Sequence, residues 1–153
     1  MERSIYREDG RREAQQMAAL FGRYYVKPTA SAIRDAQNLF PKYRHYQEAR
    51  RHALKLAFWP GFDGGGGIVE DLHWSWIDGM GEPRAGELRI HETIGGHDNL
   101  RIIFYVSPTV LPEDTMPRIW TLAVLQKKNM RFDSRDLSTF RGRLTILLQR
   151  HYS

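Results

Sequence analysis

Two lysines follow a strongly apolar run near the end of the chain. Residues 118–143 read RIWTLAVLQKKNMRFDSRDLSTFRGR, in which the apolar stretch 119–125 gives way to Lys127 and Lys128, with Arg131 shortly after. Cations at the exit of a buried strand can bind phosphate, because fixed positive charge stabilises phosphate oxygens. The pattern therefore predicts a phosphate-handling surface at the end of this strand, with Arg131 contacting phosphate from the loop.

An arginine and a histidine alternate in the segment GELRIHE, residues 86–92. Arg89 and His91 lie two residues apart, so on a strand their side chains point to the same face. Histidine suits proton transfer near neutral pH, and arginine suits binding of phosphate oxygens. Tyr105, in the apolar run LRIIFYV over residues 100–106, could stack on a nucleic-acid base. These residue types favour chemistry on a nucleic-acid backbone.

Each of these side chains also has an ordinary structural role open to it. The lysine pair could be a solvated strand end, a strand histidine is commonly just packed or hydrogen-bonded, and Tyr105 could be a core residue. Arg101, near the start of the same apolar run, could pair with Glu87 or Glu92 across the sheet, because opposite charges on neighbouring strands attract.

Metal and cofactor chemistry are not expected. The six histidines show no HExxH or comparable ligand spacing, and the chain has no cysteine for disulfides, thiolate ligands or nucleophilic catalysis. The glycines at 64–67 are followed by Ile68-Val69-Glu70, whereas a phosphate-binding P-loop needs a lysine followed by Ser or Thr. The glycine run is expected to be a connector.

Apolar spacing divides the chain into a helical part and a strand part. The expected helices cover residues 11–26, 31–40, 42–58 and 134–150. The expected strands cover residues 69–77, 87–91, 100–106 and 119–125. This order predicts an α+β fold, with N-terminal helices packed on a small, mainly antiparallel four-stranded twisted sheet that a C-terminal helix closes.

A chain of 153 residues fits one compact domain. We expect a helical region over 1–59, of which 1–30 form an extension, a glycine-rich connector and first strand over 60–86, and the main sheet with its helix over 87–153. The N-terminus is too polar for a secretory signal, and no apolar run of about 18 residues marks a membrane span. The sequence therefore predicts a soluble, cytoplasmic protein.

The net charge of +5 conceals three segments of opposite sign. Residues 1–59 carry 12 Lys and Arg against 6 Asp and Glu, residues 60–116 carry 3 against 10, and residues 117–153 carry 8 against 2. Two basic segments that flank an acidic one could present a basic face to RNA, or could neutralise the acidic segment within the fold. Charge alone leaves both interpretations open.

Three motifs, in order, resemble the RelE/ParE superfamily of bacterial toxins, in particular its HigB-like and phage-derived branch. They are GELRIHE, NLRIIFYV and RIWTLAVLQKKNMRFDSRDLSTFRGRL, and the resemblance covers about residues 85–145. That branch has a Glu-Leu-Arg strand, then an arginine-bearing strand, then a strand that runs into a lysine pair with a helix behind it. The family also has a helical hairpin before its sheet, for which residues 31–58 are the counterpart. Gln126 stands where the branch usually has an aromatic residue.

The resemblance implies a RelE-like fold and the toxin of a type II toxin–antitoxin system. Toxins of this type cut mRNA on the ribosome, usually in the A site, by attack of the ribose 2′-hydroxyl on the adjacent phosphate. The reaction uses neither metal nor cofactor. The expected partners are a cognate antitoxin and mRNA on the 70S ribosome.

The implied reaction needs positive charge on the phosphate and groups that move two protons. Arg101, which lies on the arginine-bearing strand, is the expected phosphate stabiliser, and Lys127 is expected to neutralise charge. Arg89 and His91 complete the expected catalytic set, with His91 as general acid or base. The expected RNA-binding residues are Lys128, Arg131 and Tyr105.

Other classes of function stay open. A non-catalytic, ParE-like protein would use the same scaffold to inhibit DNA gyrase, and a phage-derived regulator would use it to bind nucleic acid. The basic segments by themselves also suit a general nucleic-acid-binding module, which would bind naked RNA or DNA with a strong salt dependence.

Overall fold

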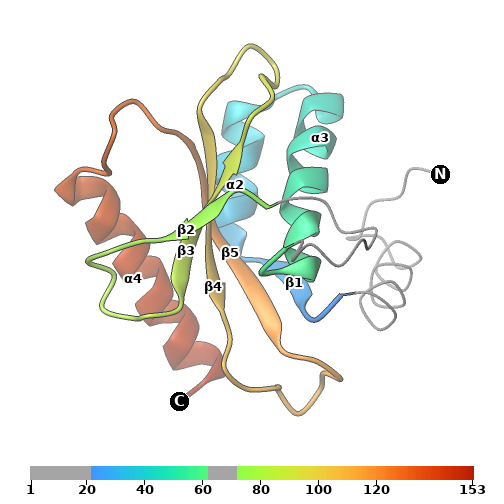
Figure 1. Cartoon of the computed structure of the whole chain (residues 1–153), viewed down its shortest axis with the longest axis vertical. Coiled ribbons are helices and arrows are strands. Elements are labelled where there is room, and N and C mark those ends of the chain that lie inside the picture. The colour runs from blue at the N-terminus through green and yellow to red at the C-terminus, as the bar shows by residue number, and fades with distance from the viewer. Residues whose placement is uncertain (1–21, 62–71) are drawn as a thin grey trace.

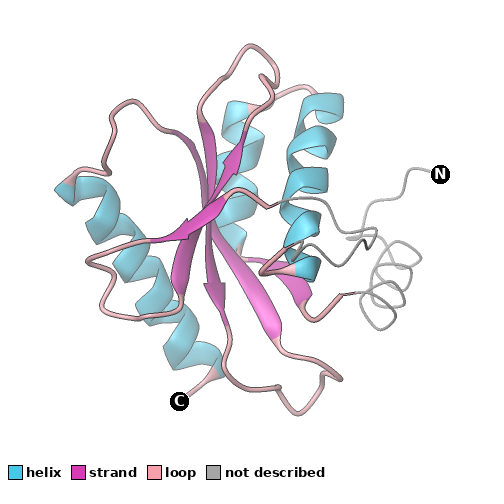
Figure 2. Ribbon diagram, viewed as in Figure 1, coloured by secondary structure: helices cyan, strands magenta, loops and turns pink. Residues whose placement is uncertain are grey.

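The chain folds as one open, mixed β-sheet with α-helices on both of its faces (Figure 1). The computed structural model describes residues 22–61 and 72–153. Their elements are β1 (Tyr25–Pro28), α2 (Ala30–Leu39), α3 (Tyr43–Leu54), the 3-10 helix η1 (Lys55–Phe58), β2 (Trp74–Trp76), β3 (Ala85–Ile90), β4 (Leu100–Val106), β5 (Arg118–Gln126) and α4 (Ser134–His151). The expected α+β class is confirmed (Figure 2).

Four of the five strands form the expected antiparallel meander. The strand order is β1-β5-β4-β3-β2, and β2, β3, β4 and β5 each pair antiparallel with the next. The expected strand over 100–106 matches β4, and those over 87–91 and 119–125 match β3 and β5 within two residues. Of the expected strand over 69–77, β2 occupies Trp74–Trp76, while residues 69–71 and the glycine run lie outside the described residues.

The fifth strand corrects the expectation for the N-terminal part of the chain. The sequence predicts a helix that ends at residue 26, within an extension over 1–30. Residues 25–28 instead form β1, which pairs in parallel with Arg118–Thr121 of β5. Val26 is buried in the core, and the backbone N–H of Tyr25 donates to the carbonyl of Pro117. Pairing with a distant, buried strand therefore outweighs the local helical spacing. Residues 22–24 of the expected helix are not helical, and residues 11–21 lie outside the described residues.

Helices cover the two faces of the sheet with separate apolar cores. The α2–α3 hairpin lies on one face, against residues such as Leu88, Ile102 and Phe104. On the other face α4 packs through Phe140 and Leu144. Because strand side chains alternate, one run of buried strand residues supplies both cores. The helices expected over 31–40, 42–58 and 134–150 correspond to α2, α3 with η1, and α4.

An ion pair covers the part of the β5 edge that β1 does not reach. Asp35 on α2 accepts a hydrogen bond from the backbone N–H of Val124 (3.1 Å), and Arg143 on α4 donates to the carbonyl of Leu122 (2.9 Å). The two side chains also pair with each other, with 2.6 Å between Arg143 Nη1 and Asp35 Oδ2. They thus occupy polar backbone groups that an edge strand otherwise leaves open to pairing.

In the described part of the chain, none of the helices has the length and apolar character needed to cross a membrane.

Candidate functional site

A carboxylate and two cations from three strands meet on the α4-facing side of the sheet. Glu87 on β3 accepts a hydrogen bond from Arg101 Nε on β4 (3.0 Å) and another from Lys127 Nζ just after β5 (3.3 Å). Arg101 Nη1 also donates to the carbonyl of Leu100 (3.1 Å). The exposed fractions of the three side chains are 12% for Glu87, 9% for Arg101 and 11% for Lys127. Shielding from solvent strengthens their mutual attraction.

Strand alternation and register bring these three groups together. On β3, Leu88 and Ile90 pack into the core on the α2–α3 side. Glu87, the residue before Leu88, therefore points to the other face. Arg101 lies beside β3, opposite Arg89 in the register. The backbone N–H of Lys127 donates to the carbonyl of Asn99 (2.9 Å), which extends the β4–β5 pairing past the end of β5. The cluster therefore depends on long-range pairing and not on one continuous motif.

An open depression of about 490 Å³ lies over Glu87 and Lys127. Its other lining residues come from the end of β2 and the residues after it, from the loop before α4 and from the first turn of α4: Trp76, Ile77, Asp78, Met130, Arg131, Phe132 and Leu137. We call it the Glu87 depression. Lys127 Nζ lies 4.4 Å from the centre of the Phe132 ring, a cation–π contact that fixes the ammonium group beside the carboxylate. Aromatic rings and charges thus share one open surface.

The residues predicted from the lysine-bearing segment are divided between paired and exposed positions. Arg101 is buried and Lys127 largely so, both bound to Glu87, which is the cross-strand pair that the sequence left open as an alternative for Arg101. Lys128 and Arg131 are exposed, and Arg131 lines the Glu87 depression. Their predicted roles with RNA remain predictions.

Tyr105 is a core residue in this structure. It is 4% exposed and belongs to the apolar cluster under α4. Burial raises the pKa of its hydroxyl, and the nearby Glu82 adds to the shift. The predicted stacking on an RNA base needs an exposed ring face, which the packing under α4 does not offer. Strand alternation placed this ring inward, because Tyr105 is on the α4-facing side where that helix covers the sheet.

Arg89 and His91 line a different hollow from Lys127. This second hollow, of about 230 Å³, lies at the outer edge of the sheet, where the end of α3 approaches β3 and the residues before β2. We call it the histidine cleft, and its lining residues are His52, Lys55, Leu72, His73, Leu88, Arg89, His91 and Glu92. The structure therefore separates the expected catalytic set into two groups.

Sequence reasoning missed several members of these two sites. The sequence predicted Glu87 only as a possible structural partner of Arg101. Glu87 lies two residues before Arg89, so alternation puts both side chains on one face. Phe132 and His73 gave no sequence signal of a site. Trp76 is 44% exposed and packs against Trp59, with 5.5 Å between ring centres. Only the pairing of β2 with β3 brings Trp76 near the loop that follows β5.

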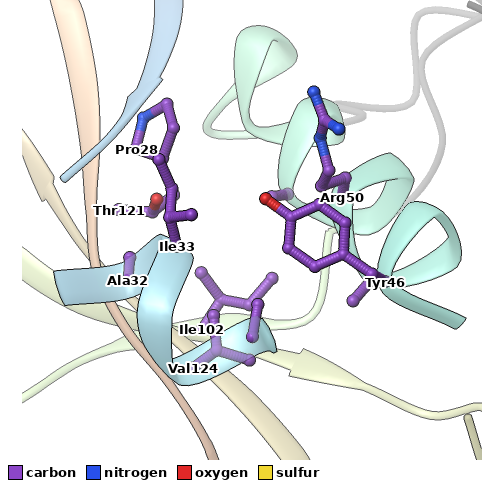
Figure 3. Close-up of a pocket in the computed structure, with 11 residues that line it drawn as sticks. Pro28, Ala32, Ile33, Tyr46, Arg50, Ile102, Thr121 and Val124 are labelled. Carbon is purple, nitrogen blue, oxygen red and sulfur yellow. The ribbon is translucent and has the colours of Figure 1, made fainter. Parts of the chain in front are cut away.

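A narrow apolar cleft lies between α2 and α3 (Figure 3). It is lined mainly by small and aliphatic residues, among them Ala32, Ile102 and Val124, and holds about 30 Å³ of space for water-sized molecules. Tyr46 and Arg50 lie at its side on α3, with the Arg50 guanidinium carbon 5.2 Å from the centre of the Tyr46 ring. Few polar groups line the cleft, so we interpret it as a gap in the packing between the two helices and the sheet.

Within residues 22–61 and 72–153, no group of three or more histidine or acidic side chains is placed so that it could hold a metal ion. The chemistry available at the Glu87 depression is therefore that of a carboxylate, fixed cations and aromatic surfaces. Such a set can accept a proton and stabilise negative charge on phosphate.

Comparison with known proteins gives no match: no family model, no curated protein and no solved structure is significantly similar to this chain.

Proposed function

We propose that the chain is a RelE-like toxin that cleaves mRNA on the ribosome, in the cytoplasm, at the Glu87 depression. One observation carries the proposal: Glu87 on β3, Arg101 on β4 and Lys127, the residue after β5, converge beneath an open, aromatic-rimmed surface. Largely shielded charges are costly to a fold unless they are paired, so a purely structural role would be met as well by apolar residues. The order of elements, a helical hairpin followed by the antiparallel strands and α4, is also the order that the family resemblance implies.

The proposed reaction divides among the groups of the depression. Glu87 accepts the proton of the ribose 2′-hydroxyl, whose oxygen attacks the adjacent phosphorus. The bond from phosphorus to the 5′-oxygen breaks, and a 2′,3′-cyclic phosphate forms. Lys127 stabilises the charge on the phosphate oxygens and protonates the leaving 5′-oxygen. Arg101 holds Glu87 in place and adds fixed positive charge behind it.

RNA binding in this proposal uses the rim of the depression. Arg131 and Lys128 contact phosphates, because both are exposed cations beside the reacting groups. Trp76 and Phe132 offer ring surface for a base, since stacking on aromatic rings is the usual way proteins hold single-stranded RNA. A cognate antitoxin would neutralise the toxin by covering this surface.

Mapping mRNA ends after brief induction tests the proposal. The parent chain should produce new 5′ ends within coding regions, and Glu87→Gln should reduce them about a hundredfold, because Gln cannot accept the proton. Lys127→Ala with Lys128→Ala should have an effect of similar size. Arg135→Ala is the matched control, since Arg135 is an exposed cation on the first turn of α4.

Intact mRNA after induction of the parent chain would overturn the proposal. Full cleavage by the Glu87→Gln variant would show that Glu87 is not the base, and would also count against the proposal. A purified chain added to a cell-free translation system separates direct cleavage from secondary effects in cells.

The pairing inside the Glu87 depression favours one second candidate, a non-catalytic binder such as a ParE-like gyrase inhibitor. Because Glu87 already engages both Arg101 and Lys127, these cations are partly neutralised before any phosphate arrives. A gyrase supercoiling assay distinguishes the two candidates. Inhibition of supercoiling together with intact mRNA supports the binder, whereas mRNA cleavage with normal supercoiling supports the nuclease.

A further inference from the structure

The histidine cleft gathers basic side chains from three parts of the chain. His52 and Lys55 come from the end of α3 and the start of η1, His73 from the residue before β2, and Arg89 and His91 from β3 and the residue after it. Glu92 is the only acidic residue among the eight that line the cleft. The Glu87 depression, by contrast, has its carboxylate at the centre of its cations.

Contacts inside the cleft hold the histidines in place. The rings of His73 and His91 meet edge to face, with 4.3 Å between their centres and 88° between their planes. The backbone N–H of Arg89 donates to the carbonyl of His73 (2.7 Å), which fixes the two segments side by side. His73 and His91, on adjacent hydrogen-bonded segments, therefore lie beside Arg89 in the lining of one cleft.

Among the described residues that line the cleft, the one carboxylate, that of Glu92, is at the rim. Glu92 Oε2 lies 3.4 Å from His52 Nε2, and the Glu92 side chain is 63% exposed while that of His52 is 17% exposed. An exposed carboxylate can turn to solvent at small energetic cost. An incoming anion can thus replace Glu92 beside His52 without leaving a buried charge unpaired.

We propose that the histidine cleft binds a phosphate group, as inorganic phosphate or as the terminal phosphate monoester of a nucleotide. Arg89 supplies a two-pronged donor that fits phosphate oxygens, and Lys55 adds a point charge. The three histidines of the cleft each carry a ring N–H that can donate to a phosphate oxygen. A phosphate monoester carries close to two negative charges near neutral pH, which suits the Arg89 guanidinium and the ring N–H donors beside it.

This assignment is independent of the proposed nuclease function, because it uses no residue of the Glu87 depression. It also differs from a metal site. The described residues include no group of three or more histidine or acidic side chains arranged to hold a metal ion.

Titration of the purified full-length chain with inorganic phosphate tests the site. The measurements are isothermal calorimetry and ¹H–¹⁵N chemical-shift mapping, in a phosphate-free buffer near neutral pH. We expect saturable binding that moves the amide signals of His73, Arg89 and His91.

Variants identify the groups that bind. Arg89→Gln, and separately His73→Gln with His91→Gln, should each weaken phosphate binding about tenfold or more. Arg135→Gln and Glu87→Gln should bind phosphate as the parent does, so a failure of the nuclease proposal cannot be mistaken for a failure of this one. Unchanged amide spectra away from the cleft show that each variant is folded.

A trinucleotide with a 5′-phosphate, compared with the same trinucleotide without it, separates a terminal monoester from backbone phosphates. Preference for the phosphorylated form supports the proposal, as does binding of inorganic phosphate alone. Equal binding of both trinucleotides with no binding of inorganic phosphate overturns it. Lack of saturable binding of inorganic phosphate, or parent-like affinity in both cleft variants, also overturns it.

Discussion

The α4-facing side of the sheet has two halves built from the same strands. In one half, Ile103, Tyr105 and Trp120 are buried under Phe140 and other apolar residues of α4. In the other half, the same strands and the residues after them supply Glu87, Arg101 and Lys127, and the Glu87 depression lies open above them. The first half is an ordinary apolar core. The second half has charged side chains that are almost as shielded from solvent, and these are paired with one another.

The two halves of this surface therefore contribute differently to the stability of the fold. Burying apolar area stabilises a fold without specific partners, but shielded charges stabilise it little and destabilise it strongly when one partner is lost. Selection for stability alone would favour apolar residues at the positions of Glu87, Arg101 and Lys127 as well. The charged half is therefore the part of this face where function is the better explanation.

The largest expected effect comes from the apolar half. Phe140→Ala should lower the free energy of unfolding by about 3–5 kcal/mol, because it opens a cavity under a ring that is 3% exposed and contacts Phe132 edge to face. Urea unfolding measures the change. Ile146→Ala on the same helix, where Ile146 is 51% exposed, should stay within about 1 kcal/mol of the parent. Equal losses in the two variants would show that α4 is not docked as described.

Breaking the charged half should cost somewhat less. Glu87→Ala leaves Arg101 and Lys127 shielded and without their carboxylate, so we expect a loss of about 3 kcal/mol in the free energy of unfolding. Glu92→Ala is the matched control, because that carboxylate is 63% exposed and its pairing with His52 is worth at most about 0.5 kcal/mol. Similar small losses for both variants would mean that the Glu87 cluster is an ordinary surface pair.

Replacing the whole charged cluster sharpens the comparison. Glu87→Leu combined with Arg101→Met and Lys127→Met removes all three charges at similar side-chain volume. The triple variant should recover most of the stability lost in Glu87→Ala, to within about 1.5 kcal/mol of the parent. Cleavage of mRNA should nevertheless be absent. A stable, fully active triple variant would show that the charged half plays no part in the reaction.

The smallest effect concerns the alkaline side of the stability curve. Burial raises the pKa of Tyr105 in the folded chain above its ordinary value of 10.0, so ionisation of this group favours the unfolded state. Its contribution is complete below about pH 10 and is lost as the pH rises through the folded-state pKa. Tyr105→Phe should therefore flatten the decline in thermal midpoint between about pH 9 and pH 11. An identical decline in parent and variant would contradict the buried position of this hydroxyl.

Local patterns predicted most of the helices and strands but fewer of the site contacts. The alternation of Glu87 with Arg89 and the apolar run that ends at Lys127 are visible in the printed sequence, and both lie where the strands were expected. The cross-strand pairing of Arg101 with Glu87 was one of two pairings that the sequence left open, and register alone selected it. Phe132 could not be assigned, because its contact with Lys127 depends on the path of a loop.

The sequence by itself determined the α+β order of elements, the antiparallel strands and the positions of the cations, because periods of two and of about 3.6 residues are local properties of a chain. Tertiary structure decided the rest. Pairing with β5 made residues 25–28 a strand, and packing under α4 buried Tyr105 in the core. The fold also divided the predicted site residues between the Glu87 depression and the histidine cleft. These outcomes depend on contacts between residues far apart in the chain, whose free energy is set by burial and pairing that no short window of sequence contains.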